Sequence, residues 1–227
     1  MNAVRIGGRV PALTPFSRSD PIPPDLSFER AWQGTICGID EAGRGPLAGP
    51  VVAAAVILPE DLPTVLLTQL DDSKRLSAGK RSRLYQTIRQ TARVGVGLAA
   101  VDEIDRFNIL QATFLAMRRA LDQLHRDGRG AVDGALIDGN QPPPLPCPVR
   151  CIVRGDSLSL SIAAASVVAK VTRDRLMAEL AAACPGYGWE RNAGYGTAEH
   201  RQALRRLGPT PHHRKSFAPV ADLFDSL

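Results

Sequence analysis

The chain has 227 residues, a mass of 24.3 kDa, a formal net charge of +5 and an isoelectric point near 9.3. Its 44% hydrophobic and 22% charged residues match soluble globular proteins, which argues against a wholly disordered chain. The longest unbroken apolar run, residues 51–58, is much too short to span a bilayer, so we expect no membrane partner. The basic charge favours a polyanionic partner, but only weakly, because many basic proteins bind none.

The first thirty residues contain several arginines and prolines but no continuous apolar stretch, so they do not resemble a secretory signal. We predict a flexible tail over residues 1–30 and a single folded domain over residues 31–227. The four cysteines form no Cys-x-x-Cys pair. Without an export signal we expect free thiols, no zinc site and a cytoplasmic location.

Two apolar segments rich in β-branched residues, 34–40 and 51–58, flank a turn that contains glycine and proline. This pattern predicts a β-hairpin. A helix is predicted from Ser77 to about Ala92, with Ser77 as its N-cap. Residues 94–101 form the third predicted strand.

From Asp102 to about His125, apolar residues recur at alternating steps of three and four, which predicts a long amphipathic helix. Residues 135–138 end a fourth strand, 149–153 form a fifth, and 159–183 form a second long helix. Hairpins supply antiparallel pairs and a helical crossover supplies a parallel pair. The order therefore predicts an α/β fold with a mixed five-stranded sheet flanked by helices.

Acidic residues stand at the ends of three predicted strands: Asp40 with Glu41, Asp138, and Asp156. An α/β sheet presents its site at strand ends, although Asp beside Gly is also common turn chemistry. Phosphodiester cleavage through two divalent ions about 4 Å apart needs several converging oxygen ligands. The four acids together predict such a metal site, since without metal they would repel one another.

The segment DEAGRGPLAG resembles a dinucleotide-binding fingerprint, but the glycine spacing fails and no helix follows. Gly43 and Gly45 could let the backbone approach a sugar-phosphate chain, with Arg44 held nearby. A plain hairpin turn with a solvated arginine explains the same residues. Both interpretations stay open.

Near the C-terminus, Tyr187, Trp189 and Tyr195 lie among glycines in PGYGWERNAGYGT. These rings could stack on bases of a nucleic acid or cover the edge of the core. The basic run 212–215, HHRK, could contact phosphates or form an ordinary solvated surface.

Residues 155–158 spell GDSL, the block of a class of serine esterases, which would make Ser157 a nucleophile. Those enzymes carry the block early and an Asp-x-x-His near the end, where the base activates the serine. Here the block is late, and the only Asp-x-x-His, Asp122 to His125, precedes it inside a predicted helix. A serine esterase and a non-catalytic nucleic-acid-binding module remain the alternatives to a metal-dependent nuclease.

Seven segments resemble ribonuclease HII in order and spacing, from about Gly34 to Val220: GIDEAGRGPLAGPVVAAAVIL, DDSKRLS, RFNILQATFLAMRRAL, LIDGN, GDSLSLSIAAASVVAKVTRDRLM, GYGT and HHRKSFAPV. The resemblance implies a ribonuclease H-like catalytic domain with a helical C-terminal part. It also implies an endoribonuclease that hydrolyses the RNA strand of RNA/DNA hybrids. Such an enzyme also incises 5′ of ribonucleotides embedded in duplex DNA, leaving 5′-phosphate and 3′-hydroxyl ends.

By the same resemblance, the catalytic cluster that holds Mn²⁺ or Mg²⁺ would consist of Asp40, Glu41, Asp138 and Asp156. The first three would be direct ligands. Asp156 would be a ligand or would position the attacking water. The implied partners are RNA/DNA hybrids and ribonucleotide-containing duplex DNA, bound by a monomer.

The resemblance further assigns the reading of the RNA–DNA junction to Gly43, Arg44 and Gly45 together with Tyr195, through a ribose 2′-OH. Two lysines, Lys74 in DDSKRLS and Lys170 in SVVAK, match basic positions of the family. Either lysine could hold a phosphate or pair with a carboxylate.

Two positions depart from the family pattern. Asn192 and Ala193 precede Gly194 and Tyr195 where relatives usually carry a lysine, and Ala163 replaces a common helix serine. Arg191 is our candidate for the missing phosphate contact.

Overall fold

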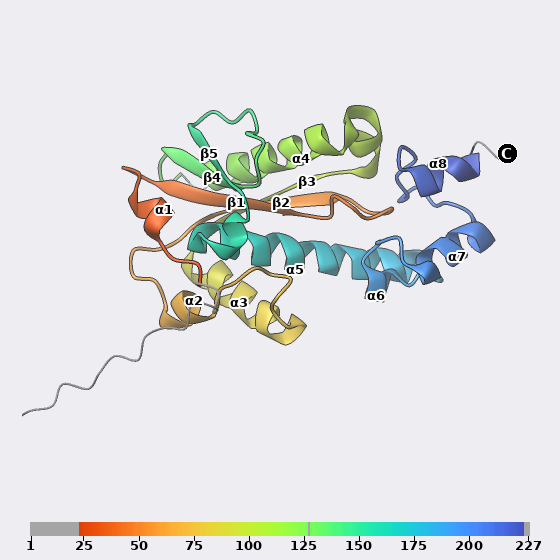
Figure 1. Cartoon of the computed structure of the whole chain (residues 1–227), viewed down its shortest axis with the longest axis horizontal. Helices are drawn as coiled ribbons and strands as arrows, with labels where there is room; N and C mark the ends of the chain where they lie inside the picture. The colour runs from red at the N-terminus through yellow and green to blue at the C-terminus, as the bar shows by residue number, and fades with distance from the viewer. Residues whose placement is uncertain (1–22, 127, 225–227) are drawn as a thin grey trace, which may run out of the picture.

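The computed structural model describes residues 23–126 and 128–224, and a twisted sheet lies at its centre (Figure 1). The strands are β1 (Ile36–Ala42), β2 (Val51–Ile57), β3 (Arg93–Ala99), β4 (Gly134–Asp138) and β5 (Val149–Ile152). Their order across the sheet is β3-β2-β1-β4-β5. The β3-β2-β1 pairs are antiparallel and the β1-β4-β5 pairs are parallel. The predicted hairpin and mixed five-stranded sheet are confirmed.

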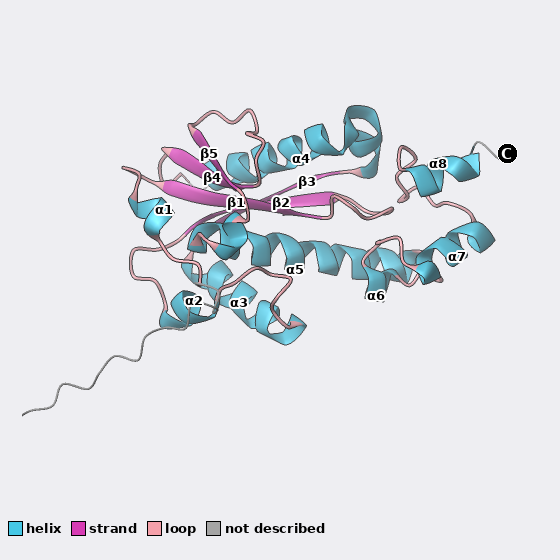
Figure 2. Ribbon diagram, viewed as in Figure 1, coloured by secondary structure: helices cyan, strands magenta, loops and turns pink. Residues whose placement is uncertain are grey.

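Helices cover both faces of this sheet (Figure 2). One face packs against α4 (Val101–His125), and the other packs against α5 (Leu160–Ala183), with α2 (Thr64–Gln69) and α3 (Ala78–Thr91) on the same side. Successive strand residues point to opposite faces, so β2 contributes to two cores. Ala53 is buried on the α4 side and Ala54 on the α5 side.

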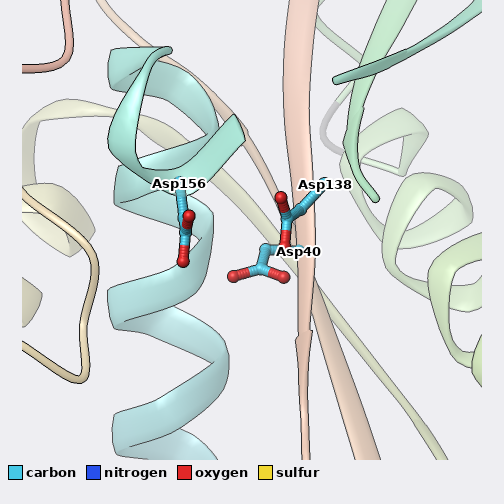
Figure 3. Close-up of side chains that lie close together, drawn as sticks. All are labelled: Asp40, Asp138 and Asp156. Atoms are coloured by element: carbon cyan, nitrogen blue, oxygen red, sulfur yellow. The ribbon is translucent and has the colours of Figure 1, made fainter. Parts of the chain in front are cut away.

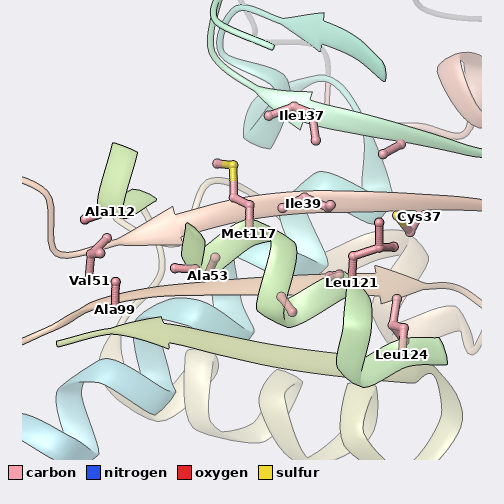
Figure 4. Close-up of a cluster of buried hydrophobic side chains, with 14 of the residues drawn as sticks. Cys37, Ile39, Val51, Ala53, Ala99, Ala112, Met117, Leu121, Leu124 and Ile137 are labelled. Atoms are coloured by element: carbon pink, nitrogen blue, oxygen red, sulfur yellow. The ribbon is translucent and has the colours of Figure 1, made fainter. Parts of the chain in front are cut away.

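The core under α4 shows why this helix lies flat on the sheet (Figure 4). Met117 and Leu121 of α4 pack against Ile39 of β1 and Ile137 of β4 in one buried cluster. Burial of apolar side chains at this helix–sheet contact stabilises the fold by about 25 cal/mol per Å². The same contact holds the two strands that carry Asp40 and Asp138 in fixed positions.

Two helices differ in detail from their predicted forms. Ser77 caps α3 as expected, because its side chain accepts a hydrogen bond from the Lys80 N–H. In contrast, α4 is not continuous: Asn108 has φ 67° and ψ 164°. Its side-chain oxygen accepts the N–H groups of Leu110 and Gln111, so Asn108 ends one helical segment and caps the next.

Residues 23–30, the last part of the expected flexible tail, pack against the start of α5. Asp25 forms a β-bridge with Ser159. In α1 (Ser27–Arg30), Glu29 accepts hydrogen bonds from the Ser159 hydroxyl at 2.6 Å and the Ser161 N–H at 2.9 Å. Residues 1–22 lie outside the described residues, so the tail remains a prediction there.

The C-terminal part is helical, as predicted, and lies beyond the far end of α5 (Figure 1). It consists of α6 (Trp189–Asn192), α7 (Ala198–Leu207) and α8 (Ala218–Phe224). A separate hydrophobic cluster that includes Met177, Trp189 and Leu204 joins it to α5. Within the described residues, no helix combines the length and apolar character needed to cross a membrane.

Candidate active site

Three aspartates from distant segments meet at one point beside the sheet (Figure 3). Asp40 lies in β1, Asp138 ends β4, and Asp156 lies in the short helix η1 (Gly155–Ser157) just before α5. One carboxylate oxygen of each lies within 4.8 Å of the other two. Because β1 and β4 pair in parallel with Ile39 opposite Ile137, the residues that follow come to lie side by side.

A hydrogen bond from the main chain fixes the position of Asp156 relative to Asp138. The Gly155 N–H donates a hydrogen bond of 2.7 Å to Oδ1 of Asp138. This bond ties η1 to the end of β4 and brings Asp156 to its place opposite Asp40. The long helix α5, which follows η1 and packs along β1, holds the same geometry from the other side.

Burial and mutual repulsion disfavour the charged forms of these acids. The pKa of Asp40, which is only 4% exposed, is raised well above its usual value by burial and then by the charges of Glu41 and Asp138. Burial, followed by the charge of Asp138, raises the pKa of Asp156 to about 6. A bound cation would relieve this repulsion, so the electrostatics fit a metal centre.

Glu41 stands next to the trio but is not part of it. Its Oε1 accepts a hydrogen bond of 3.3 Å from Arg44, and burial raises its pKa. Its Oε2 is buried and has no hydrogen-bond partner among the described residues. A buried carboxylate oxygen without a donor is unusual, and a cation is one partner that would satisfy it.

A pocket of about 400 Å³ opens beside the trio, lined by Asp72, Lys74, Arg75, Asp138, Arg154, Asp156 and Ser157. Lys74 Nζ lies 4.0 Å from Oδ2 of Asp156, and the lysine side chain is 77% exposed. Asp72 and Arg154 also line this pocket, although the sequence did not lead us to predict them as site residues. Asp72 lies two residues before Lys74 in the segment DDSKRLS, and its place in that segment could have identified it as a candidate site residue.

Lys170 is held differently. Its Nζ forms an ion pair of 2.6 Å with Asp174, one turn further along α5, and it does not line the pocket. Of the two interpretations open for Lys170, the structure supports pairing with a carboxylate.

The glycine-rich loop between β1 and β2 lies against the C-terminal part. Gly43 has φ +95° and is buried, whereas Arg44 and Gly45 are exposed. A Cβ atom on Gly45 would lie 3.7 Å from Cε1 of Tyr195, whose side chain is 45% exposed. The structure therefore brings together the exposed part of this loop and the tyrosine that the sequence analysis grouped with it.

The other two aromatic residues belong to the core. Tyr187 and Trp189 are buried and stack with ring centroids 5.1 Å apart. The Tyr187 hydroxyl donates to the Gly208 carbonyl at 2.7 Å, and Trp189 Nε1 donates to His200 at 3.0 Å. The core-edge interpretation is correct for these two rings, and only Tyr195 can reach a ligand.

The basic run 212–215 corrects the sequence analysis. His213 and Arg214 are completely buried, so neither phosphate contact nor a solvated surface describes them. His213 Nε2 lies 3.1 Å from Nε2 of His200. Arg214 donates hydrogen bonds to main-chain carbonyls of the loop between β1 and β2.

Residues 191–193, just before Gly194 and Tyr195, also have defined contacts. Arg191 is paired with both Glu190 and Glu199, so a phosphate contact by Arg191 would compete with these two carboxylates. Asn192 shapes the turn before Tyr195: its Nδ2 donates to the Tyr187 carbonyl, and its Oδ1 accepts the Gly194 N–H, each at 2.8 Å.

The serine esterase alternative lacks a base. The Ser157 hydroxyl donates to the Arg154 carbonyl at 2.9 Å, and among the described residues no histidine lines the pocket beside it. The four cysteines are free thiols, as expected.

Comparisons with known proteins point to one family. A family model described as Ribonuclease HII matches residues 37–220. The ribonuclease HII of Paramagnetospirillum magneticum is 67% identical over 199 residues, which cover 87% of this chain and 97% of the relative. That of Rhodospirillum rubrum is 64% identical over 202 residues, which cover 88% of this chain and 91% of the relative.

Solved structures with the same architecture include ribonuclease H2 from Pyrococcus horikoshii, with a TM-score of 0.68 and 24% identity over 85% of this chain and 98% of that chain. Bst-RNase HIII in complex with Mn²⁺ gives a TM-score of 0.70 and 19% identity over 93% of this chain and 76% of that chain. At these identities the likeness concerns the fold alone. The predicted ribonuclease H-like fold is confirmed.

Proposed function

Because this chain belongs to the ribonuclease HII family and is thus an endonuclease that cleaves RNA in RNA/DNA hybrids, we propose that its cleavage site is the carboxylate cluster. The cluster consists of Asp40, Glu41, Asp138 and Asp156. The observation that carries the proposal is the convergence of three of these acids, from segments far apart in sequence, within 4.8 Å.

The donor set fits Mg²⁺ or Mn²⁺. Carboxylate oxygens are hard ligands, the pKa values of Asp40 and Asp156 are raised by burial and repulsion, and Glu41 keeps one buried oxygen without a donor. The related fold of Bst-RNase HIII in complex with Mn²⁺ supports the same choice. Bound divalent ions supply activation of the attacking water and stabilisation of charge on phosphorus and on the leaving 3′-oxygen.

The protein side chains have separate tasks in this proposal. Asp40, Glu41 and Asp138 hold the ions, and Asp156 is a further ligand or orients the attacking water. The Gly155 N–H keeps Asp138 in one orientation through its 2.7 Å hydrogen bond. Lys74, at the mouth of the pocket, offers an exposed positive charge to a backbone phosphate.

The glycine-rich loop and Tyr195 form the substrate-reading part. Arg44, Gly45 and Tyr195 are exposed side by side, so a ribose 2′-OH at an RNA–DNA junction can be read there. We assign incision to the 5′ side of a ribonucleotide in duplex DNA, with 5′-phosphate and 3′-hydroxyl products. In this proposal the enzyme acts as a cytoplasmic monomer with one catalytic domain, residues 31–227, against which residues 23–30 pack.

The test is a DNA duplex with a single ribonucleotide, incubated with Mn²⁺, with Mg²⁺ or with chelator. We expect cutting on the 5′ side of the ribonucleotide with either metal and none with chelator. An all-DNA duplex of the same sequence is the control. Binding without cutting under both metals would instead favour the non-catalytic module.

A further inference from the structure

Two buried arginines converge on the loop between β1 and β2. Arg173 lies in α5 and is 1% exposed, and Arg214 lies in the segment before α8 and is 0% exposed. Charged side chains are rarely buried this fully unless they are paired. Both guanidinium groups face the same stretch of main chain, residues 43–50.

The hydrogen bonds of Arg214 all end on this loop. Its Nε donates to the Gly49 carbonyl at 3.0 Å, and its two terminal nitrogens donate to the carbonyls of Gly43, Arg44 and Gly49. Within the described residues, its hydrogen-bond acceptors are all main-chain carbonyls. Arg214 therefore holds both ends of the loop at once.

These bonds set the direction of two peptide groups. In a planar trans peptide, the carbonyl and the following N–H point in opposite directions. The Gly43 and Arg44 carbonyls point inward to Arg214, so the N–H groups of Arg44 and Gly45 point outward. Neither N–H has a hydrogen-bond acceptor among the described residues. Two adjacent free donors are thus presented where the loop is exposed.

Arg173 connects the loop to the turn that carries Tyr195. It donates to the carbonyls of Pro50 at 3.0 Å and Ala48 at 3.1 Å in the loop, and to the Ala193 carbonyl at 2.9 Å. Ala193 lies two residues before Tyr195. Arg173 therefore fixes the distance between the two halves of the substrate-reading part.

The chemistry of the contact requires arginine. Burial lowers the pKa of Arg173 to about 10 and that of Arg214 to about 9, so both remain cations at neutral pH. No carboxylate accepts a hydrogen bond from either group in the described part of the chain. A rigid guanidinium fork can serve several carbonyls in fixed directions, whereas a lysine ammonium is a single point donor on a flexible stem.

We propose that Arg173 and Arg214 are positioning residues, which orient the Arg44 and Gly45 N–H groups and the Tyr195 turn toward the nucleic acid. This inference rests on the proposed role of the loop in substrate reading. It assigns the two arginines no contact with substrate.

The test combines Arg214→Lys with Gly45→Ala, a substitution on the outward side of the loop. A displacement of about 1 Å in a substrate-reading group can cost a hundredfold in rate. We expect Arg214→Lys to lower kcat/KM for the single-ribonucleotide duplex by about ten- to a hundredfold. Amide hydrogen exchange in residues 43–50 should become faster, while Mn²⁺ should raise the melting temperature as in the wild type.

The double variant Arg214→Lys with Gly45→Ala tests whether Arg214 acts on cleavage through the loop. If Arg214 acts through the loop, the double variant should be little worse than the more damaging single variant, because contacting groups are non-additive. The matched control is Arg93→Lys, because the Arg93 guanidinium also donates to main-chain carbonyls, those of Leu124, Arg129 and Gly130, and lies at the end of β3 away from the loop. The effect of this control substitution on kcat/KM should be small and should add to the effect of Gly45→Ala.

Three outcomes would overturn the inference. They are an Arg214→Lys enzyme with unchanged kcat/KM, full additivity with Gly45→Ala, and loop exchange equal to the wild type. If Arg214→Lys does not fold, Arg173→Lys tests the same prediction, and failure of both to fold would mark the arginines as general determinants of the fold. An unchanged Gly45→Ala enzyme would instead refute the proposed role of the loop itself.

Discussion

Gly43 and Arg173 approach each other so closely that a Cβ atom on Gly43 would lie 1.9 Å from Nε of Arg173. Gly43 also has φ +95°, a backbone conformation that side chains disfavour. We therefore expect Gly43→Ala to lower the free energy of unfolding by about 1–3 kcal/mol and to reduce cleavage strongly. Urea unfolding and a cleavage assay on the single-ribonucleotide duplex measure the two effects.

Gly45, two residues later, provides the contrast. Its Cβ would meet only Tyr195, at an ordinary 3.7 Å, so Gly45→Ala should leave stability almost unchanged while cleavage falls. Gly79→Ala in α3 is the control, because nothing lies within 4 Å of its Cβ. It should stabilise the helix by about 0.8 kcal/mol and leave cleavage intact. Equal stability losses at Gly43 and Gly45 would contradict the assigned loop geometry.

The metal centre predicts the effect of Asp138→Asn. The asparagine oxygen can still accept the Gly155 N–H, so the fold should persist, but the charge that binds a divalent ion is lost. Cleavage should fall to background. Relief of repulsion with Asp40 and Asp156 should raise the stability of the metal-free protein by about 1 kcal/mol.

Thermal unfolding with and without Mn²⁺ checks this second effect. In the wild type, Mn²⁺ at a hundred times its Kd should add about 2.7 kcal/mol of stability, and Asp138→Asn should lose most of that gain. Asp61→Asn, an exposed site with the same change of charge, should keep both cleavage and the Mn²⁺ response. A large drop in stability of metal-free Asp138→Asn would mark Asp138 as a structural residue.

The sequence predicts those parts of this molecule that local patterns determine. The β1–β2 hairpin follows from two apolar runs around a glycine-rich turn. The meeting of Asp40 and Asp138 follows from the parallel pairing of β1 and β4, whose last paired residues, Ile39 and Ile137, come directly before the two aspartates. Glu41 could not be placed in this way. Its position beside Asp40, Asp138 and Asp156, but outside their cluster, depends on the direction of its side chain and not on its spacing in the sequence.

Arg214 could not be placed from the sequence because its partners are distant. In HHRK it has the surroundings of a surface residue, yet the Gly43 carbonyl that it binds is 171 residues away. The break in α4 was hidden for a different reason. The apolar spacing of Phe107 and Leu110 runs past Asn108 as in an unbroken helix, and only the φ of 67° and ψ of 164° at Asn108 show the interruption. This backbone conformation is strained for a residue with a side chain, and the two hydrogen bonds of the Asn108 side chain help to hold it.

Tyr195 and Tyr187 should respond differently to loss of their hydroxyl groups. Tyr195 is 45% exposed beside Gly45, so Tyr195→Phe should leave the melting temperature unchanged and lower kcat/KM for the single-ribonucleotide duplex. The buried Tyr187 hydroxyl donates to the Gly208 carbonyl. Tyr187→Phe should therefore cost about 1 kcal/mol of stability and leave kcat/KM unchanged. The reverse pattern would mean that Tyr187 is the residue that meets the substrate.

His213 predicts a loss of stability in acid. Burial, and then the charge of His200, lowers its pKa from 6.5 to about 4. Between these two pH values the unfolded chain binds a proton that the folded chain does not. The stabilising contribution of neutral His213 to the folded state is therefore complete above pH 6.5 and is lost as the pH falls toward 4. The expected loss is on the order of 3 kcal/mol. His200, whose pKa burial also lowers, acts in the same direction.

Urea unfolding at several pH values isolates this contribution when the wild type is compared with His213→Gln. The variant should be less stable at pH 7, and the difference should shrink as the pH approaches 4. His212→Gln, at the half-buried neighbouring position, should keep the pH dependence of the wild type. If the free energy of unfolding differed between wild type and His213→Gln by the same amount at all pH values, His213 would not be the source of the acid-induced loss of stability.

Lys74 and Arg191 should differ in the salt dependence of substrate binding. Each phosphate contact by a cation adds about 0.9 to the slope of log K against log salt, because counterions are released. Lys74 is exposed at the pocket mouth, 4.0 Å from Asp156, whereas Arg191 is already paired with two glutamates. In an Asp138→Asn background, which binds without cutting, Lys74→Ala should reduce the slope by about 0.9 and Arg191→Ala should leave it unchanged. A reduced slope for Arg191→Ala would show that Arg191 leaves its glutamate partners for a phosphate, as the missing lysine before Gly194 first led us to expect.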